Sequence, residues 1–535
     1  LIGAPICALI MINLTWKLVI FALLGYCESA RILVVLPSFG KSHHFVYRPV
    51  LKALAERGHN ITYLTSVAWD DRPSSVDQRL ITLNQKEIFE KLSKRVNPSN
   101  DITQLKSSSV QMSSMYNTIF NIVIPMCLEH PVTQALIHSD EEYDLVLSET
   151  MRGSEAYSAF AYRFNATGVV FLMRGDNSWP NELCGLPDNP SHMVDATSPF
   201  TDDMDFWQRL KNTYDSSYNK IMSYNNLRQH QEFVDKYFHN VSKNWPPVAR
   251  MVSDQALVLV NSHHSVGYAY PKAPHVKEVG GVNMPEPKPL PMELEKYLEN
   301  ATHGLIYFSM GSNIDFGSIK AYHVLNIFVK VFSSRKEIVF WKESKNKEED
   351  GTFDNIFRSA WFPQIDVLAH NKTKLFISHG GISSIFESVS MGVPIVGIPI
   401  FGDQKKNVQR AVKQGYAVLL ELSNLTEASL SWALDEVLNN PKYKENAVRQ
   451  SKLFHDRPMK PVDEAVYWIE YVLRHGKVLQ PAAALMPFYQ LYLLDILAFV
   501  FTSFVVTVIL VRKSVHLVTG ALLARKSILK KEKHH

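Results

Sequence analysis

Cysteine is scarce in this sequence, and its scarcity excludes two classes of protein. The 535 residues contain four cysteines, no C-x-x-C pair and no histidine-rich cluster, so the sequence predicts neither a disulfide-stapled scaffold nor a zinc site. Low-complexity tracts are also missing, and a composition of 46% hydrophobic and 20% charged residues is typical of globular proteins. The net charge is only +4, so nothing predicts a nucleic-acid partner.

Hydrophobic stretches stand near both ends of the chain. The first lies in "MINLTWKLVIFALLGYCESA", which begins at Met11, and its apolar run Leu18–Leu24 is too short to cross a bilayer. A lysine before the run and small residues after it are the plan of a secretory signal peptide, with cleavage near Ser29 or Ala30. We therefore expect residues 1–29 to be upstream sequence and signal peptide.

The second stretch, "LYLLDILAFVFTSFVVTVILV", covers residues 491–511 and is long enough to cross a hydrocarbon core of about 30 Å. Arg512 and Lys513 follow it, and the tail over 512–535 holds seven Lys/Arg against one Glu. Because positively charged flanks stay in the cytoplasm, we predict a single-pass type I membrane protein. Its tail would be cytoplasmic and its soluble domains luminal.

The tail ends in "KEKHH", which resembles the dilysine retrieval signal of endoplasmic reticulum membrane proteins in the placement of Lys531 and Lys533. This predicts residence in the endoplasmic reticulum membrane and retrieval by coat-type machinery. Cys127 and Cys184 would then be luminal, and the sequence leaves open whether they pair. Six sequons would be open to glycosylation there, at Asn60, Asn165, Asn240, Asn300, Asn371 and Asn424.

Strand-like and helix-like patterns alternate in two series between these stretches. "RILVVLP" is a continuous apolar run, typical of a parallel strand buried on both faces. Helical spacing follows as far as Gly58, and "NITYLTS" is the next strand, so a doubly wound domain opens here. The rhythm restarts at "GLIYFSMGS", after prolines at 285, 287, 289 and 291 that form a stiff linker.

We therefore predict an α/β fold of two doubly wound Rossmann-like domains that face a cleft. Ligands of such sheets bind at the carboxyl ends of the strands. The soluble part is predicted to contain the first domain (30–284), a Pro-rich linker (285–291) and the second domain (292–455). It is followed by C-terminal helices with a juxtamembrane segment (456–490), the transmembrane helix (491–511) and the tail (512–535).

The stretch "KLFISHGGISSIFESVSMGVPIVGIPIFGDQ" carries the densest group of candidate site residues. His379, Gly380 and Gly381 end a strand and open a helix, whose N-terminus can bind phosphate. The two glycines let an anion approach the backbone. Ser383 or Ser384 can donate a hydroxyl hydrogen bond to the same group.

Other candidates extend this site along the chain. Glu387 lies one turn deeper on the helix, where an acid suits the vicinal hydroxyls of ribose. Asp403 and Gln404 end the next strand and can bind a polyhydroxylated group. Upstream, Trp361 can stack on a base, and Gln364 follows it in "WFPQ".

Three more residues complete the predicted site. Gly311 and Ser312 end an earlier strand and can offer N–H groups to phosphates, and we expect Asn407 to face the same site. Read together, the groups suit base, diphosphate, ribose and sugar, which predicts a nucleotide-sugar site.

The stretch "WFPQIDVLAHNKTKLFISHGGISSIFESVSMGVPIVGIPIFGDQ" resembles the signature of the UDP-glycosyltransferases. These are membrane-anchored conjugating enzymes with two Rossmann domains, the GT-B fold, and the resemblance covers nearly the whole chain, including "GKSHH" and "DRPMKPVDEAVYWIEYVLRHG". It implies that uracil stacks on Trp361, that Gln364 and Glu387 hold the ribose, that His379, Ser383 and Ser312 hold the diphosphate, and that Asp403 and Gln404 hold the sugar. The family often has Asn where Ser383 stands.

The resemblance also places acceptor and base in the first domain. The family's catalytic histidine follows a serine in "FGKSHHFVY", which indicates His43, with His44 as the alternative. The family pairs that histidine with an aspartate, and "YDLVLSE" offers Glu149 instead. We expect an inverting direct displacement, with the leaving UDP stabilised by the helix N-terminus and His379. No D-x-D-like motif is evident, so we expect no cofactor and no divalent metal.

The sugar and the acceptor are less determined. Lys405 and Lys406 are candidates to bind a glucuronate carboxylate, yet "GLPDNPSHMVDATSPFTDDMDFWQRLKN" resembles invertebrate members, which mostly use UDP-glucose. We favour UDP-glucose, with a small lipophilic hydroxyl compound as acceptor in conjugation and detoxification. The alternatives are a catalytically silent UDP-sugar-binding homologue or partner subunit, or a nucleotide-sugar epimerase or hydrolase of the same fold. Homo-oligomerisation stays open.

Overall fold

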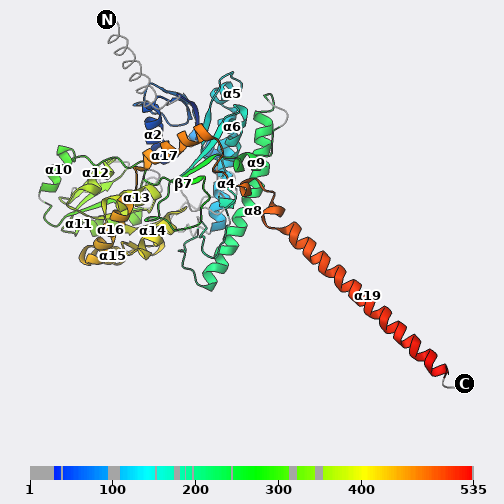
Figure 1. The fold of residues 1–535 in the computed structure, drawn as a ribbon. Helices are drawn as coiled ribbons and strands as arrows, with labels where there is room; N and C mark the ends of the chain where they lie inside the picture. Colours follow the sequence, from blue (N-terminus) through cyan, green and yellow to red (C-terminus); the bar gives the residue numbers. More distant parts are fainter. Residues whose placement is uncertain are drawn as a thin grey trace, which may run out of the picture. The chain divides into compact units, whose positions relative to one another are not determined.

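A computed structural model gives the fold of the chain (Figure 1). It describes residues 29–532 apart from several short internal gaps, at 38–39, 94–108, 151–152, 174–180, 183, 187, 196–197, 242–244, 300, 312–321 and 344–352. The predicted signal peptide before Ser29 and the retrieval residue Lys533 lie outside the described residues.

The first half of the chain forms a seven-stranded sheet in the order β3-β2-β1-β4-β5-β6-β7, and every neighbouring pair is parallel. Of the central strands, β1, β4 and β6 are almost entirely apolar, apart from Arg31 and Ser148 at strand ends, because helices cover both faces of the sheet. The strands are β1 (Arg31–Leu36), β2 (Asn60–Thr65), β3 (Val76–Leu80), β4 (Leu145–Ser148), β5 (Thr167–Leu172), β6 (Leu257–Val260) and β7 (Val276–Glu278).

A second parallel sheet, of six strands, follows in the order β10-β9-β8-β11-β12-β13. Its strands are β8 (Leu305–Ser309), β9 (Ile338–Lys342), β10 (Ile356–Ser359), β11 (Thr373–Ser378), β12 (Ile395–Gly397) and β13 (Ala417–Leu419). The two doubly wound sheets confirm the predicted fold class.

Helices connect the strands of each sheet. In the first half they are α2 (Lys41–Glu56), α3 (Gln85–Ser93), α4 (Ser109–Glu129), α5 (Pro131–Ile137), η2 (Glu155–Ser158), α6 (Ala159–Arg163), α8 (Phe206–Tyr237) and α9 (Val248–Ser253). In the second half they are α10 (Met292–Glu299), α11 (Tyr322–Ser333), α12 (Gln364–Ala369), α13 (Ile382–Met391), α14 (Gln404–Lys413), η3 (Leu422–Asn424), α15 (Glu427–Asn439) and α16 (Pro441–His455).

The helix after the second sheet returns to the first one. α17 (Pro461–His475) packs against α2, β5 and β6, and its apolar face joins the core of the first sheet. Glu470 adds polar contacts on the same helix, at 2.9 Å from Arg57 and 3.4 Å from His59. Both sheets and α17 therefore form one compact unit that ends at Pro481.

Residues from Ala482 onward form a second compact unit. It contains η4 (Ala482–Leu485), α18 (Phe488–Leu491) and α19 (Leu494–Glu532). One helix in the described part of the chain, Leu494–Ser527, is long and apolar enough to cross a membrane, and the mean hydropathy of its most apolar 18 residues is 2.5. It begins three residues after the predicted start of the span and continues well past Val511. The direction of crossing and the compartment stay predictions.

We expect the return of α17 to be measurable as stability. Ile469 on this helix is completely buried in the first core, so Ile469→Ala should lower the free energy of unfolding by about 2–5 kcal/mol. Tyr467 on the same helix is 41% exposed, and Tyr467→Ala should cost under about 0.5 kcal/mol. Urea unfolding of the full chain in detergent measures both. Equal effects would contradict the packing of α17 as a core element.

Candidate active site

The candidate residues of the second half lie at the carboxyl ends of the parallel strands. His379 follows β11, Gly311 follows β8, Trp361 follows β10 and Asp403 follows β12. Because neighbouring strands are parallel, these ends meet along one edge of the sheet. The topology therefore collects side chains that are up to 92 residues apart in the sequence, from Gly311 to Asp403.

Two glycines pack closely against the ring of His379. A Cβ atom added to Gly311 would lie 2.7 Å from the ring Cε1, and one added to Gly381 would lie 2.5 Å from the ring Nε2. Gly380 has a φ of +82°, and an added Cβ there would lie 2.4 Å from a methyl group of Val408. No larger residue fits at these three positions without moving the imidazole or α14, so the glycines fix the histidine between strand and helix.

His379 has the chemistry of a neutral ligand for an anion. Burial lowers its pKa to about 4, with opposing effects from Asp403, which raises the pKa, and Lys342, which lowers it. The ring is therefore uncharged at neutral pH. Its Nδ1 atom is buried without a hydrogen-bond partner in the described structure. α13 begins three residues later with Gly381 at its N-cap and no side-chain cap, which leaves backbone N–H groups for an anion.

Glu387 and Gln364 meet in a second part of the site. Gln364 donates to the Glu387 carboxylate and approaches Ser384 Oγ at 3.5 Å, and its amide oxygen accepts from Tyr307 Oη at 3.1 Å. Burial raises the pKa of Glu387 to about 7, against the effects of Gln364 and Lys342, which lower the pKa. An acid braced in this way can accept hydrogen bonds from vicinal hydroxyls.

Trp361 exposes 64% of its surface at the same edge. Lys342 Nζ lies 4.6 Å from the centre of its ring, and burial lowers the pKa of this lysine. Lys342 was not among the residues predicted from the sequence, because a lone lysine after "EIVFW" belongs to no recognisable motif. Its position as the last residue of β9 was the signal that could have found it.

Asp403, Gln404 and Asn407 occupy the start of α14. Asn407 Nδ2 donates to Asp403 Oδ2 at 2.9 Å and to the backbone oxygen of Gly380 at 3.0 Å, so it joins the loop after β11 to the loop after β12. The amide oxygen of Gln404 accepts from the backbone of Ile400 and Phe401. A donor role for Gln404 would therefore fall to its Nε2 atom.

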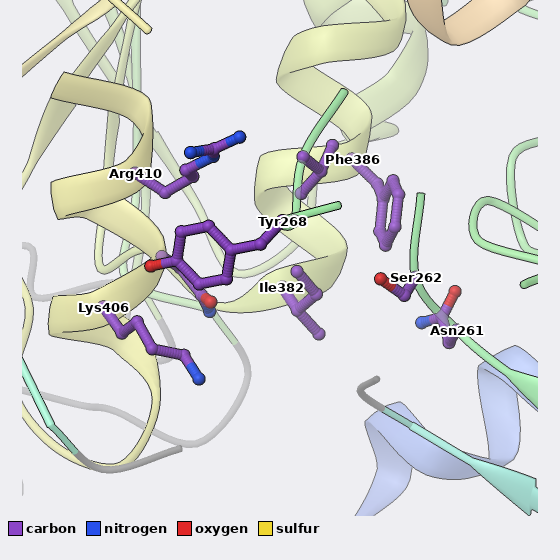
Figure 2. A pocket seen from close by; sticks show the side chains of 10 residues that line it. Asn261, Ser262, Tyr268, Ile382, Phe386, Lys406 and Arg410 are labelled. Carbon is purple, nitrogen blue, oxygen red and sulfur yellow. The ribbon is translucent and has the colours of Figure 1, made fainter. Parts of the chain in front are cut away.

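The start of α14 also touches the first half of the chain. Lys406 is buried and its Nζ lies 3.5 Å from the backbone oxygens of Val194 and Asp195. Arg410 pairs with Asp202 at 3.1 Å and lies over the ring of Tyr268. Figure 2 shows Arg410 and Lys406 on either side of Tyr268, at a small pocket that Asn261, Ser262, Ile382 and Phe386 also line.

The loop before Asp403 meets the first half at a second point. Gly402 has a φ of +70°, and an added Cβ would lie 2.8 Å from the hydroxyl of Tyr116 on α4. The loop that carries the candidate sugar ligands is therefore packed against the first domain. A ligand at Asp403 would therefore lie close to residues of both halves.

The first half places a histidine and an acid at adjacent strand ends. His43 stands in the first turn of α2, after β1, and Glu149 follows β4, the neighbour of β1. His43 Nδ1 lies 2.8 Å from Glu149 Oε2, and both side chains are partly exposed. The extra methylene of glutamate thus reaches the imidazole. The two histidines are consecutive residues of α2.

His44 has a different environment. It is completely buried, and its Nδ1 lies 2.6 Å from Tyr63 Oη and 3.1 Å from Thr65 Oγ1. The structure therefore places His43 beside the acid and His44 in the core. Of the other candidates, Ser383 is half-buried in the first turn of α13, Ser384 is buried beside Gln364, and Ser312 lies outside the described residues.

Comparison with known proteins supports one family. The family model "UDP-glucoronosyl and UDP-glucosyl transferase" matches residues 30–529. The chain is 34% identical to UDP-glucosyltransferase 2 of Dactylopius coccus over 91% of its own length and 94% of that protein. It is 28% identical to UDP-glucuronosyltransferase 2C1 of Oryctolagus cuniculus, over 88% of its length and 95% of the relative.

Solved structures share the fold at low identity. The calicheamicin glycosyltransferase has a TM-score of 0.55 at 17% identity and covers 84% of this chain and 99% of its own. A UDP-glucosyltransferase from Polygonum tinctorium has a TM-score of 0.55 at 15% identity, over 84% and 99% of the two chains. These similarities show the two-domain GT-B fold of glycosyltransferases.

The raised pKa of Glu387 predicts a pH effect on stability. The folded chain holds this proton up to pH about 7, whereas a glutamate in the unfolded chain releases it near 4.5. The wild type should therefore lose stability relative to Glu387→Gln as pH rises from 4.5 to 7, by up to about 3 kcal/mol, and the difference should then stay constant. Unfolding of both chains across that range measures it. A difference that does not change with pH would contradict the raised pKa.

Proposed function

Because this chain belongs to the family of UDP-glucuronosyl and UDP-glucosyl transferases, we propose that it transfers glucose from UDP-glucose to a hydroxyl of a small lipophilic acceptor, with inversion at the anomeric carbon. That the chain is a UDP-glycosyltransferase follows from its family. The choice of sugar, the acceptor class, and the residue roles below are proposed. The contact between His43 and Glu149 carries the catalytic part of the proposal.

The donor is proposed to lie along the edge of the second sheet. Uracil stacks on the exposed face of Trp361, and ribose hydroxyls donate to Glu387, which Gln364 orients. The diphosphate takes the N-terminus of α13 and the neutral ring of His379. Asp403, held by Asn407, accepts from sugar hydroxyls.

The acceptor is proposed to react at His43. Its Nδ1 faces Glu149, so the opposite ring nitrogen, Nε2, takes the proton of the attacking hydroxyl. The acceptor oxygen bonds to the anomeric carbon from the side opposite UDP, and the bond from that carbon to the phosphate oxygen breaks. The electron pair leaves with UDP. The proton stays on His43, where the carboxylate of Glu149 stabilises the imidazolium.

The leaving UDP needs positive potential, and residues of the chain can supply it. The uncapped N-terminus of α13 directs backbone N–H groups and its helix dipole at the diphosphate. Lys342 lies close enough to Glu387 and His379 to influence both of their pKa values, and it adds a cation to this region. We propose that these groups act without a divalent metal.

The contacts of two lysines support glucose over glucuronate. A glucuronate carboxylate would need a cation near Asp403 and Gln404, and Lys405 and Lys406 follow directly. Lys405 pairs with Glu421 at 2.6 Å, and Lys406 is buried against backbone oxygens of the first half. Both cations are thus engaged elsewhere. The 34% identical relative is named a UDP-glucosyltransferase, which agrees with this choice.

The main alternative is a silent homologue that binds UDP-sugar without transfer. The contact of His43 with Glu149 argues against it, since a chain without catalysis has no need of a partly exposed histidine–carboxylate pair at the strand ends. An epimerase or hydrolase of the same fold would release or alter the sugar without an acceptor. UDP release with and without a phenol separates these possibilities.

We expect substitutions of the two neighbouring histidines to differ in kind. His43→Ala should lower kcat on an alcohol acceptor by about 10²–10⁴-fold while leaving UDP-glucose binding intact, because general-base help is lost. A strongly acidic phenol should be partly spared, since it requires less proton removal. Steady-state kinetics with an alcohol and with such a phenol measure both effects.

His44→Ala serves as the matched control. His44 is buried and hydrogen-bonded to Tyr63, so this change should lower stability more than it lowers kcat of the folded fraction. Wild-type kcat in His43→Ala on an alcohol would refute His43 as the base.

A donor panel tests the sugar. The full chain in microsomes should use UDP-glucose at least tenfold better, in kcat/KM, than UDP-glucuronate, and a chelator should leave the rate unchanged. Lys405→Ala should keep this preference, because Lys405 is paired with Glu421. A preference for UDP-glucuronate that Lys405→Ala removes would reverse the choice of sugar. Loss of activity with the chelator would contradict the metal-free proposal.

A further inference from the structure

The first half of α8 buries polar side chains. This helix runs over 32 residues, and four of its buried residues within three turns are Asn212, Asp215, Ser216 and Asn219. Helices of globular proteins usually bury an apolar stripe and expose the polar one. In this part of α8 the polar face is buried instead, so the exposure of the opposite face needs an explanation.

Hydrogen bonds hold the polar face in place. Asn212 Nδ2 donates to the backbone oxygens of Pro190 and Met193, at 2.7 and 2.9 Å, and Asn219 Nδ2 donates to Asp195 Oδ2 at 2.9 Å. The backbone N–H of Asp195 in turn donates to Asn212 Oδ1, at 2.9 Å. Rotation of the helix would leave these buried groups unsatisfied, so the orientation is fixed.

The outer face of the same segment is apolar and aromatic. Successive residues of a helix advance by about 100°, so six large side chains fall within an arc of about 100°, opposite the buried polar residues. They expose between 42% and 73% of their surface: Phe206, Trp207, Leu210, Tyr214, Ile221 and Tyr224. We call these six residues the α8 stripe. From Phe206 to Tyr224 it extends for about 27 Å at 1.5 Å per residue, along the helix labelled α8 in Figure 1.

The second half of α8 has a mixed buried face and a polar outer face. Leu227, Val234 and Tyr237 are buried there with the polar Asn226 and His230, and no large apolar side chain of α8 after Tyr224 is exposed. Exposed apolar side chains are therefore confined to the α8 stripe and do not belong to the helix as a whole. An exposed apolar patch of this kind marks a surface that another apolar phase covers.

We propose that the α8 stripe lies in the interface of the lipid bilayer to which the chain is anchored. Its composition fits this occupant, because Trp and Tyr rings gather where apolar chains meet polar headgroups. The connection also fits. The compact unit ends at Pro481 and the helix able to span a membrane begins at Leu494. Only twelve residues (482–493) join the two, and fully extended they span about 40 Å, so the connection keeps the compact unit tethered near the membrane.

The proposal gives the stripe a role in the reaction. α8 directly follows the segment that contacts the start of α14, where Lys406 meets Val194 and Arg410 meets Asp202. A bilayer contact at α8 would hold the acceptor domain at the surface where lipophilic compounds concentrate. This role rests on the proposed acceptor class, but the membrane contact itself does not.

Tryptophan fluorescence in brominated lipid tests the proposal. The full chain is reconstituted into phosphatidylcholine vesicles with or without brominated acyl chains. No tryptophan follows Trp468, so the spanning helix contributes no tryptophan signal. We expect brominated lipid to quench the wild type, and Trp207→Phe to remove more than half of that quenching.

Trp432→Phe is the matched control. Trp432 is 56% exposed on α15, which carries no such stripe, and this variant should keep the wild-type quenching. Tyr214→Lys combined with Ile221→Lys should reduce quenching with Trp207 still in place.

Three results would overturn the membrane assignment. One is the absence of quenching in the wild type, and another is quenching that survives Trp207→Phe. The third is spontaneous disulfide-linked dimers of Leu210→Cys without lipid quenching, because the occupant would then be a second copy of the chain. Transferase activity is measured in parallel, and its loss with quenching intact would count against the proposed function and not against the membrane contact.

Discussion

Parallel pairing of neighbouring strands is the constraint on which the rest of this molecule depends. A parallel sheet directs every strand end of one kind to the same edge, and the crossover helices cover both faces. In the second sheet this edge receives Gly311, Lys342, Trp361, His379 and Asp403. In the first sheet it brings His43 and Glu149 together from adjacent strands. No single segment of sequence contains either group.

Close packing at that edge shifts the pKa values of the buried site residues. Gly311 and Gly381 leave no room around the ring of His379, and the resulting burial keeps the imidazole neutral. Burial acts in the opposite direction on Glu387 and favours its protonated form. A bound nucleotide would meet a neutral donor, an uncapped helix and a carboxyl group poised near neutrality. Such groups cost stability when the site is empty and are typical of binding sites.

The two halves are joined by contacts that the site shares. Lys406 and Arg410 fix the start of α14 to the first half, and the same helix begins with the candidate sugar ligands. Tyr116 packs beside Gly402, and α17 ties the end of the second half to the core of the first. The two strand-end edges that carry the candidate residues are therefore held against one another by side chains next to those residues.

The sequence by itself determined the two-sheet fold, the apolar helix near the C-terminus, and a long motif that resembles the signature of the family. Apolar runs, glycine breaks and the proline linker are local signals. They can be recognised in the sequence because each strand and each helix has its own hydrophobic pattern. Resemblance of two first-domain stretches to the family also indicated His43 and Glu149, and their 2.8 Å contact required the register of β1 and β4. The roles of the donor residues stay predictions.

Tertiary structure alone decided the features that depend on what lies opposite a side chain. The return of α17, the burial of His44 beside Tyr63, and the pairing of Lys405 with Glu421 arise between distant segments, so no local pattern reports them. Lys342 became a site residue only because β9 and β10 pair side by side. The α8 stripe could not be predicted from the sequence for the same reason. Its polar and apolar residues have the spacing of an ordinary amphipathic helix, and only the contacts with the neighbouring loop show that the polar face is the buried one.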